Sequence, residues 1–532
     1  MVNIFLSHNR GFSWIHQEGT PYTKGYVFDI DANSHYFEKQ ELLNYFGDGI
    51  EDPLAFKEKL RGTDGFFAVV HETGHYVFAA VDRLRSIPLY YGTGQGNFYL
   101  SDDAQWLRQQ VGDTDTDELS RDEYLLTGYV TGKDTLFPNV KQLQAGEFLV
   151  YHDQKLTTEQ YFEFRRCDFS GQSPEELIRQ LDQVHERVFQ RLTESLNGRT
   201  AVIPLSGGYD SRLIAVMLKR LGYENVICFS YGRQGNWESD ISAKVAGHLG
   251  YQWHGVTYNL KKWRDWYCSE NRKQFYRFSQ YHSSVPYIQD LPAVMSLQAR
   301  HVIPDDAVIV PGHSGDFLAG THISYEMTDG RTLSAEELIE GIYKYHYSLR
   351  RVRLADKHQK FDAKMAHLRH LDITTPEQMS VAADLWDWQE RQAKFVVNSV
   401  RAFEFGNLEW RLPLWDKEMM DFWCKIPFDY RLGRTLYMQY ANKYQGDMNR
   451  ALNLTRRGIE EGLLKKPADD MLSVLMRKIS YYPRHMHLYF TGKLQMTKII
   501  PLPQYISGLI RGAANPKAIL IESLLQRIAQ DK

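Results

Sequence analysis

A short stretch between two apolar segments has residue types suited to binding phosphate. Residues 204–212, PLSGGYDSR, place two adjacent glycines and two serines directly after the apolar residue Ile203. Glycine lets backbone N–H groups approach a ligand closely, and the helix start expected near Asp210 favours an anion. The hydroxyl groups of Ser206 and Ser211 add hydrogen-bond donors. The stretch therefore predicts a phosphate-binding turn.

Asp210 needs its own explanation, because a carboxylate repels phosphate. A divalent cation between the two resolves this, since Mg²⁺ is typically held by one or two carboxylates together with phosphate oxygens. The alternative is an aspartate that only caps a helix after an ordinary strand–helix turn. The turn lacks the Gly-Lys-Ser/Thr of a Walker A loop, and it is not a GxGxxG motif.

A second acidic, glycine-rich stretch follows another apolar run. Residues 307–322, AVIVPGHSGDFLAGTH, contain Gly312, Gly315 and Asp316. In open α/β sheets, ligands bind at the carboxyl ends of the parallel strands. Asp210 and Asp316 would then face one crevice, and a single metal–phosphate site explains both more simply than two unrelated helix caps.

The elements that must position these loops follow from hydrophobic periodicity. Ser173 is expected to cap a helix that has Pro174 in its first turn and ends at Asn197-Gly198. Strand and helix patterns then alternate, which is typical of a parallel α/β sheet. The expected strands cover residues 201–205 and 226–230, and the expected helices cover residues 211–221 and 238–249.

The first 160 residues or so are dense in strand patterns and aromatic side chains, which predicts a layered β domain. Two strands are expected within 65–82, a strand and a short helix within 96–111, and a hairpin within 145–156. Beyond about residue 330 the pattern is mainly helical. The final helix, 517–530, carries an apolar stripe that we expect to dock on the rest of the chain or on a partner.

The composition is that of an ordinary soluble protein. The 532 residues, 43% hydrophobic and 24% charged, are enough for about two to four domains. A net charge of −3 gives no reason to expect nucleic-acid binding. Four scattered cysteines are expected to be reduced and mostly buried, which favours a cytoplasmic location. No signal-peptide pattern and no apolar run of roughly 18 residues is present, so we expect no stable membrane insertion. The oligomeric state stays open, a homodimer included.

Several motifs together resemble one enzyme family. SGGYDS, residues 206–211, looks like the pyrophosphate loop of the N-type ATP pyrophosphatases, in particular the synthetase domains of asparagine synthetase, β-lactam synthetase and lasso-peptide cyclases. The resemblance runs in family order over about residues 170–460. It also includes FSYG at 229–232, ESDISAKVAGHLG at 238–250, PGHSGDFLAG at 311–320 and LEWRLPLWDKEMMDFWCKIP at 408–427.

This resemblance implies an α/β fold, with a parallel-sheet adenine-nucleotide-hydrolase-like domain and a helical C-terminal part. It implies that ATP is a substrate, that Mg²⁺ is required, and that an acyl-adenylate is captured by ammonia or an amine. Asp210 and Asp316 would hold Mg²⁺. The pyrophosphate would be held by Ser206, Gly207, Gly208, Asp210 and Ser211, and the adenosine would be lined by Leu205, Tyr231, Pro311 and Gly312.

The second acidic loop departs from the family pattern. The family usually has a glutamate after the first glycine and another acid after the aspartate, where this chain has His313 and Phe317. His313 could orient the substrate or transfer a proton, because the unperturbed pKa of histidine lies near neutral pH. The alternative is a residue that only packs or hydrogen-bonds. Free aspartate is therefore a doubtful substrate.

The family also uses a late basic residue to stabilise the charge that develops during adenylation. Arg456 and Arg457 of NLTRRG are the candidates for this role, with Lys465 and Lys466 as alternatives. Arginine can bind phosphate or carboxylate but does not exchange protons at neutral pH.

The N-terminal segment resembles the family's Ntn-type glutaminase in degraded form, in residues 62–92 and 99–107. The nucleophile of a class II glutamine amidotransferase is a cysteine at position 2, where this chain has Val2, and the first cysteine is Cys167. We therefore predict an α+β domain without glutaminase activity. The predicted domains are residues 1–168, residues 169–460 and a helical extension over 461–532.

The resemblance predicts an ATP-dependent, AMP-forming ligase that joins a carboxylate to ammonia or an amine. The sequence leaves three classes of acid substrate open: a uronic sugar of surface polysaccharide synthesis, a peptide that forms a macrolactam, and a small metabolite. One alternative is an adenylating enzyme with sulfur or another nucleophile as acceptor. The other is a non-enzymatic or regulatory nucleotide-binding protein with a decayed site, against which the retained Asp210 and Asp316 argue.

Overall fold

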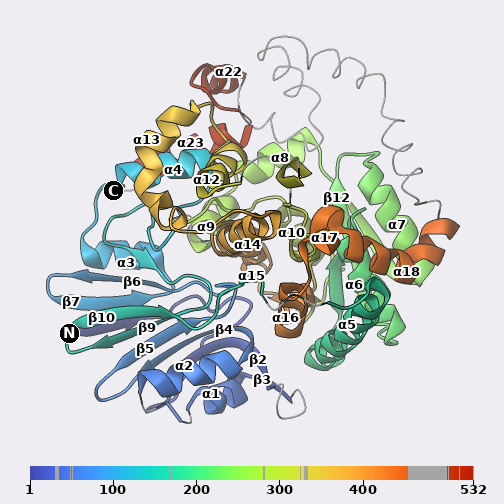
Figure 1. Ribbon diagram of the computed structural model, residues 1–532, viewed down its shortest axis with the longest axis horizontal. Coiled ribbons are helices and arrows are strands. Elements are labelled where there is room, and N and C mark those ends of the chain that lie inside the picture. The colour runs from blue at the N-terminus through green and yellow to red at the C-terminus, as the bar shows by residue number, and fades with distance from the viewer. Residues whose placement is uncertain are drawn as a thin grey trace.

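The computed structural model describes residues 1–29, 35–47, 49–50, 52–167, 169, 171–279, 282–323, 325–328, 333–452, 454, 500, 502–514 and 516–530. A strand-rich N-terminal part, blue to teal in Figure 1, lies beside a larger part built from helices around a parallel sheet. The described residues contain no helix that is long and apolar enough to cross a membrane.

Two sheets form the centre of the N-terminal part. Their strands are β1 (Val2–Phe5), β2 (Tyr22–Asp29), β3 (His35–Glu38), β4 (Asp64–Glu72), β5 (Val77–Val81), β6 (Tyr90–Gly94), β7 (Asn97–Ser101), β8 (Lys141–Gln142), β9 (Glu147–His152) and β10 (Lys155–Gln160). One sheet has the order β10-β9-β5-β4-β2-β3 and the other has the order β1-β7-β6-β8. The three hairpin and strand–helix patterns expected from the sequence are confirmed.

The two sheets are sandwiched between helices. Helices α1 (Lys39–Gly47) and α2 (Pro53–Gly62) cover the larger sheet, and their Phe46 and Phe56 are buried against Phe67 and Phe78. On its other face the larger sheet meets the smaller one, where the rings of Phe98 and Tyr151 stack at 4.3 Å. Helices α3 (Ala104–Val111) and α4 (Glu118–Thr127) follow beyond the smaller sheet. These layers confirm the expected α+β architecture.

A parallel sheet forms the centre of the second part. Its strands are β11 (Ala201–Pro204), β12 (Val226–Gly232), β13 (Gln252–Thr257), β14 (Val308–Ile309) and β15 (Glu409–Trp410), in the order β13-β12-β11-β14-β15. Each pairing is parallel. The sequence pattern gave no sign of β15, because a strand of two residues has no periodicity to detect.

The helices around this sheet begin and end close to where the sequence predicts. Helix α5 (Pro174–Leu196) is capped by Ser173, whose side chain accepts a hydrogen bond from the Glu176 N–H, and it ends at Asn197 in the left-handed conformation. Helices α6 (Tyr209–Arg220) and α7 (Trp237–Leu249) follow β11 and β12. The later helices include α8 (Leu260–Tyr267), α9 (Glu270–Phe278), α10 (Leu291–Ala299), α11 (Gly315–Leu318), α12 (Ala335–Tyr345), α13 (Leu354–Met365), α14 (Pro376–Asp387), the π-helix η3 (Trp388–Val396), α15 (Arg401–Phe405), α16 (Lys417–Cys424), α17 (Phe428–Arg431) and α18 (Thr435–Ala451).

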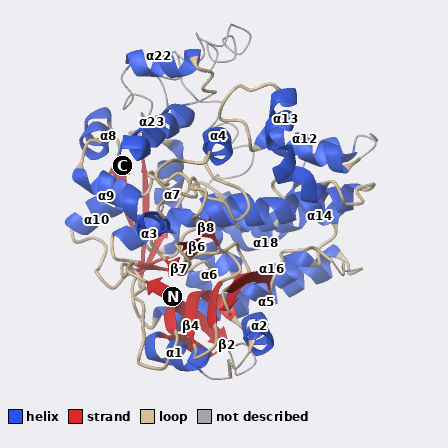
Figure 2. Cartoon of the chain, turned by 90° about the vertical axis from the view of Figure 1, so that its left-hand side faces the viewer, coloured by secondary structure: helices blue, strands red, loops and turns tan. Residues whose placement is uncertain are grey.

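The C-terminal helices return to the N-terminal part. Helices α22 (Leu502–Ile510) and α23 (Pro516–Gln530) lie at the opposite end of the molecule from α1 and α2 (Figure 2). Ile519, Ile521 and Leu524 of α23 are buried in one cluster with Tyr90 and Tyr124. The prediction that the final apolar stripe docks is confirmed. The domain boundaries at residues 168 and 460 stay predictions, and residues 461–499 lie outside the described residues.

The expectation that the cysteines are mostly buried is wrong. None of the four forms a disulfide, but Cys167 and Cys268 are exposed, Cys424 is partly buried and only Cys228 is fully buried. The physical reason is position: Cys167 lies in the connection before α5, and Cys268 caps the end of α8.

Buried polar contacts join the N-terminal part to the segment before α10. The backbone N–H of Leu136 donates to the His282 carbonyl at 2.9 Å, and His282 Nε2 lies 3.0 Å from Gln105 Oε1. His282 is 1% exposed. Burial, together with the charge of Arg108, lowers the pKa of His282 to about 3.

This buried histidine makes stability depend on pH. Below the pKa of about 6.5 in the unfolded chain, only the unfolded state takes up the proton, so stability falls as the pH drops from there toward 3. Between about pH 7.5 and about pH 5.5, His282 should account for about 1.4 kcal/mol of lost stability. We expect His282→Gln to reduce this loss, measured by urea denaturation at both pH values. The exposed His75 provides a control as His75→Gln, and equal pH dependence in wild type and His282→Gln would contradict the prediction.

Candidate functional site

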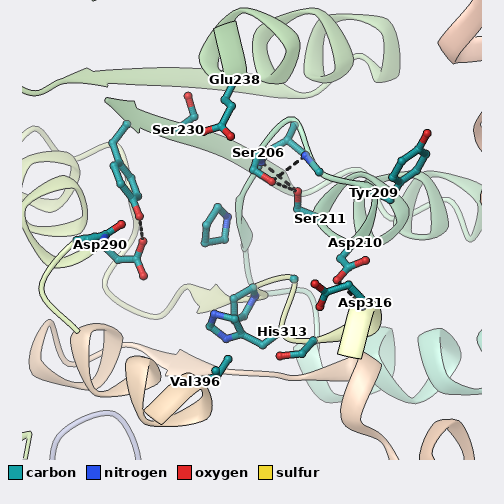
Figure 3. Close-up of a pocket in the computed structure, with 18 of the residues that line it drawn as sticks. Ser206, Tyr209, Asp210, Ser211, Ser230, Glu238, Asp290, His313, Asp316 and Val396 are labelled. Carbon is teal, nitrogen blue, oxygen red and sulfur yellow. Dashed lines mark hydrogen bonds between the residues drawn. The ribbon is translucent and has the colours of Figure 1, made fainter. Parts of the chain in front are cut away.

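The order of the parallel strands creates a crevice beside β11. The chain proceeds from β11 outward to β12 and β13, and then returns to place β14 on the other side of β11. Ligands of such sheets bind where the strand order reverses, at the carboxyl ends. A cavity of about 870 Å³ lies there, lined by segments that follow β11, β12 and β14 (Figure 3). The expectation that Asp210 and Asp316 face one crevice is confirmed.

The turn after β11 is closed by its own serines. Ser211 Oγ accepts a hydrogen bond from the Ser206 N–H at 3.0 Å and lies 3.1 Å from Ser206 Oγ, and the Gly208 N–H donates to Ser206 Oγ at 3.1 Å. Helix α6 begins directly afterwards with Gly208 as its N-cap. Its first N–H groups donate to no capping side chain among the described residues. They therefore remain available to an anion.

The two acidic loops meet at Asp210. Asp210 Oδ2 accepts a hydrogen bond from the Asp316 N–H at 2.9 Å, and Oδ1 accepts one from the Tyr437 hydroxyl at 2.6 Å. Figure 3 shows the Asp210 and Asp316 side chains next to each other. Because Gly208 caps α6 and the Asp210 carboxylate is directed at the other loop, the alternative that Asp210 is only a helix cap is wrong.

Two glycines make this approach of the loops sterically feasible. A Cβ atom on Gly312 would lie 2.9 Å from the Ser211 nitrogen, and one on Gly315 would lie 3.2 Å from Asp210 Cγ. Real Cβ contacts are seldom this short. Both loops would have to move apart to accept any side chain at these positions.

The electrostatics of the pair fit a cation. Burial, and then the charge of Asp316, raise the pKa of Asp210 to about 7, and the hydrogen bond from Tyr437 opposes this. Within the described ranges, neither carboxylate forms an ion pair with a basic side chain. Oxygen ligands that lack a positive partner are the donor set that Mg²⁺ prefers.

The predicted adenosine residues all line the same cavity, and so do the predicted pyrophosphate residues except Gly207. Leu205, Tyr231, Pro311 and Gly312 all contribute to the wall, together with Ser206 and Ser211. Gly207 does not, because it is buried under the Trp237 ring, where a Cβ atom would come within 3.0 Å.

Asp290 is a cavity residue that the sequence did not indicate. It accepts a hydrogen bond from the Tyr231 hydroxyl, and burial raises its pKa to about 6. No motif marks Asp290, because its side chain meets β12 only through the tertiary fold.

His313 lines the cavity, and Phe317 does not. His313 Nε2 lies 3.4 Å from Ser399 Oγ, while Nδ1 has no hydrogen-bond partner in the described part of the chain. Burial lowers the pKa of His313 to about 4, below the near-neutral unperturbed value on which the suggested proton transfer rests. The imidazole is uncharged at pH 7 and adds no positive charge to the cavity. Phe317 is buried between Phe164 and Trp415.

The start of α18 supplies two further residues that the sequence did not indicate. Tyr437 is 2% exposed and holds Asp210. Arg434 lines the cavity in a left-handed conformation, with φ 60°, and its charge acts on Asp210. It makes no hydrogen bond or ion pair with any residue that the structure describes. The candidates Arg456, Arg457, Lys465 and Lys466 lie outside the described residues.

Two models of known protein families match the chain. A model of the asparagine synthase family matches residues 197–472, just over half of the sequence. The chain belongs to the asparagine synthase family. A model of a glutamine amidotransferase domain matches residues 55–162. Family membership supports an ATP-dependent ligase that forms carbon–nitrogen bonds, in a family that uses ATP and typically Mg²⁺. No curated protein matches the chain.

Three solved structures with detectable similarity are distant relatives by sequence identity. The glutamine phosphoribosylpyrophosphate amidotransferase from B. subtilis is 11% identical, with 56% of this chain and 63% of that chain covered and a TM-score of 0.20. The NH3-dependent NAD synthetase from Campylobacter jejuni is 17% identical, with coverages of 41% and 94% and a TM-score of 0.20. The NMN synthetase from Francisella tularensis is 12% identical, with coverages of 38% and 98% and a TM-score of 0.19. The chain thus spans less than two thirds of the amidotransferase, and at these TM-scores the likenesses carry no weight for its function.

We expect Tyr437→Phe to weaken Mg²⁺–ATP binding about tenfold, because the variant loses one hydrogen bond to a charged group that orients Asp210. Isothermal titration calorimetry measures the affinity. Tyr440→Phe is a matched control, since Tyr440 lies one turn later on α18 and donates to Asp182 at 3.2 Å. Equal affinities for wild type and Tyr437→Phe would contradict the prediction.

Proposed function

We propose that this member of the family is an AMP-forming ligase that adenylates a carboxylate and transfers the acyl group to ammonia or an amine, without glutaminase activity of its own. One observation carries the proposal. The turn at 206–211, with the uncapped start of α6, and the carboxylates of Asp210 and Asp316 line a single cavity. This cavity lies beside β11, where the strand order of the sheet reverses. A phosphate-binding turn beside two unpaired carboxylates suits a nucleotide with a divalent cation.

The proposed reaction has two steps. An oxygen of the substrate carboxylate attacks the α-phosphorus of ATP, the bond from that phosphorus to the β-bridging oxygen breaks, and pyrophosphate leaves. The nitrogen of ammonia or an amine then attacks the acyl carbon, loses a proton, and expels AMP. The N–H groups at the start of α6 would bind the departing pyrophosphate and stabilise its charge.

Asp210 and Asp316 would hold Mg²⁺, and Tyr437 would keep Asp210 in place. The cation, when bound, supplies charge neutralisation at the phosphate oxygens. His313, which is uncharged, would orient the substrate through its unpartnered Nδ1. It would not contribute positive charge to the site.

Arg434 would serve as the basic residue that binds the polyphosphate. Its guanidinium lines the cavity close enough to affect Asp210, and it is not neutralised by a described acid. Arginine binds phosphate oxygens through two N–H groups at once. Arg456 and Arg457 stay predictions for the same role.

The N-terminal part would have lost its hydrolytic chemistry. The sequence has Val2 where the amidotransferase nucleophile is expected, and no cysteine before Cys167. The acid is proposed to be a uronic sugar, a peptide or a small metabolite. The second candidate function, a nucleotide-binding protein without catalysis, is favoured only by the change to His313 and Phe317 in the acidic loop.

Exchange of pyrophosphate into ATP, dependent on an added carboxylic acid, tests the proposal. Wild type should catalyse the exchange, and Asp210→Ala should reduce it at least about a hundredfold, because the metal–phosphate site loses a ligand. Asp305→Ala, at an exposed aspartate, is the control. Hydroxylamine should trap the acyl-adenylate as a hydroxamate. Binding of ATP without exchange across a broad acid panel would favour the non-catalytic alternative.

Arg434 allows stability and function to be separated. Glycine tolerates a φ of 60° better than arginine does, so Arg434→Gly should leave stability unchanged or raise it by about 1 kcal/mol. The same variant should raise the KM for ATP about tenfold or more, because a phosphate contact is lost. Arg450→Ala, at an exposed arginine of α18, is the control. A fall in stability with an unchanged KM would show that Arg434 is structural.

A further inference from the structure

The cavity extends beyond His313 to a wall that the nucleotide site does not explain. This wall consists of His322 and of Arg391, Gln392 and Val396 from the π-helix η3. Figure 3 shows Val396 on the side of the cavity next to His313. Irregular π-helical turns are frequent at functional sites. We call these four residues the Arg391 wall.

Arg391 is held only loosely. Its Nη1 lies 3.4 Å from His322 Nε2 and 3.7 Å from Asp387 Oδ1, and 32% of its side chain is exposed. A guanidinium has five N–H donors, so most of them remain free for a ligand. Asp387 itself is buried and does not line the cavity, and it also accepts a hydrogen bond from Gln392 Nε2 at 3.1 Å.

Gln392 presents an unsatisfied acceptor. The residue is 2% exposed and lines the cavity, yet its Oε1 has no hydrogen-bond partner among the described residues. A buried amide oxygen without a donor is unfavourable. A hydroxyl group of a bound molecule would satisfy it.

A second cation lies behind the wall. Lys517 Nζ is 3.7 Å from the centre of the Phe395 ring of the same π-helix, and no described acid pairs with it. Burial, and then the charge of Arg391, lower the pKa of Lys517 to about 8. The described acids that do line the cavity, Asp210, Glu238, Asp290 and Asp316, lie on other segments. Among the described acids, Asp387 alone lies within 4.0 Å of Arg391 or His322. Arg391 and Lys517 together therefore carry more positive charge than this one acid balances, which favours a bound anion.

We propose that the Arg391 wall binds a second anionic group of the acid substrate, remote from the carboxylate that is activated, while a substrate hydroxyl donates to Gln392. This inference rests on the proposed function and names its substrate class: a hydroxylated acid with an additional anion, as in a phosphorylated sugar acid. A guanidinium binds phosphate through two parallel hydrogen bonds, which a loosely held arginine is free to form. An apolar acid would leave both the guanidinium and the amide oxygen unsatisfied, and an amino acid without a hydroxyl group, such as aspartate, would leave the amide oxygen unsatisfied.

A panel of four acids in the pyrophosphate exchange assay tests the substrate class. D-Glucuronic acid 1-phosphate should give a kcat/KM at least about tenfold above that of D-glucuronic acid, L-aspartic acid or hexanoic acid. Arg391→Ala should remove this preference and leave the KM for ATP unchanged, and Arg391→Lys should restore part of it. Arg353→Ala, at an arginine that is 85% exposed and does not line the cavity, is the control. Equal use of the four acids, or an unchanged preference in Arg391→Ala, would overturn the inference.

Direct binding separates failure of this inference from failure of the proposed function. Calorimetry with D-glucuronic acid 1-phosphate alone should show binding to wild type and at least about tenfold weaker binding to Arg391→Ala. If binding follows this pattern but no acid supports exchange, the Arg391 wall is an anion site and the ligase proposal fails. If wild type does not bind the probe, or both proteins bind it equally, the wall is not an anion site. Thermal unfolding of each variant identifies any loss caused by misfolding.

Discussion

The site depends on holding two like charges together. Asp210 and Asp316 are 106 residues apart in the chain, yet the backbone N–H of Asp316 donates directly to the Asp210 carboxylate. Repulsion between two carboxylates in a buried setting is unfavourable. Burial, and then this repulsion from Asp316, raise the pKa of Asp210. The surrounding structure must therefore impose this geometry, and on the proposed function a cation bound with ATP would relieve the repulsion.

Several parts of the fold impose the close approach of Asp210 and Asp316. Parallel pairing of β11 with β14 starts both loops from the same edge of the sheet, and Gly312 and Gly315 let the loops touch. Helix α18 then brings Tyr437 to Asp210 from beyond residue 430. No single segment makes the site, so the sheet and α18 have to be assembled before the carboxylates face one cavity.

The N-terminal part supports the other end of the cavity. The π-helix η3 is anchored to it at both ends: Trp388 Nε1 donates to the Arg83 carbonyl at 3.0 Å, and Lys394 Nζ donates to the Gly132 carbonyl at 2.6 Å. Between them, the Gly132 N–H donates to Glu390 at 3.0 Å. A domain proposed to lack glutaminase activity thus keeps a structural role, because it fixes the helix that carries Arg391.

The sequence by itself determined the parallel sheet, the Ser173 cap, the glycine turn at 206–211 and the two acidic loops, because these are local patterns of periodicity, capping and glycine placement. It did not reveal β15, Tyr437, Arg434 or Arg391, since none of them belongs to a local pattern. It did not show that burial lowers the pKa of His313, and it misjudged the exposure of the cysteines, because both properties depend on what surrounds these side chains. Only the tertiary structure decided those features, because burial and long-range contacts exist only once distant segments pack together.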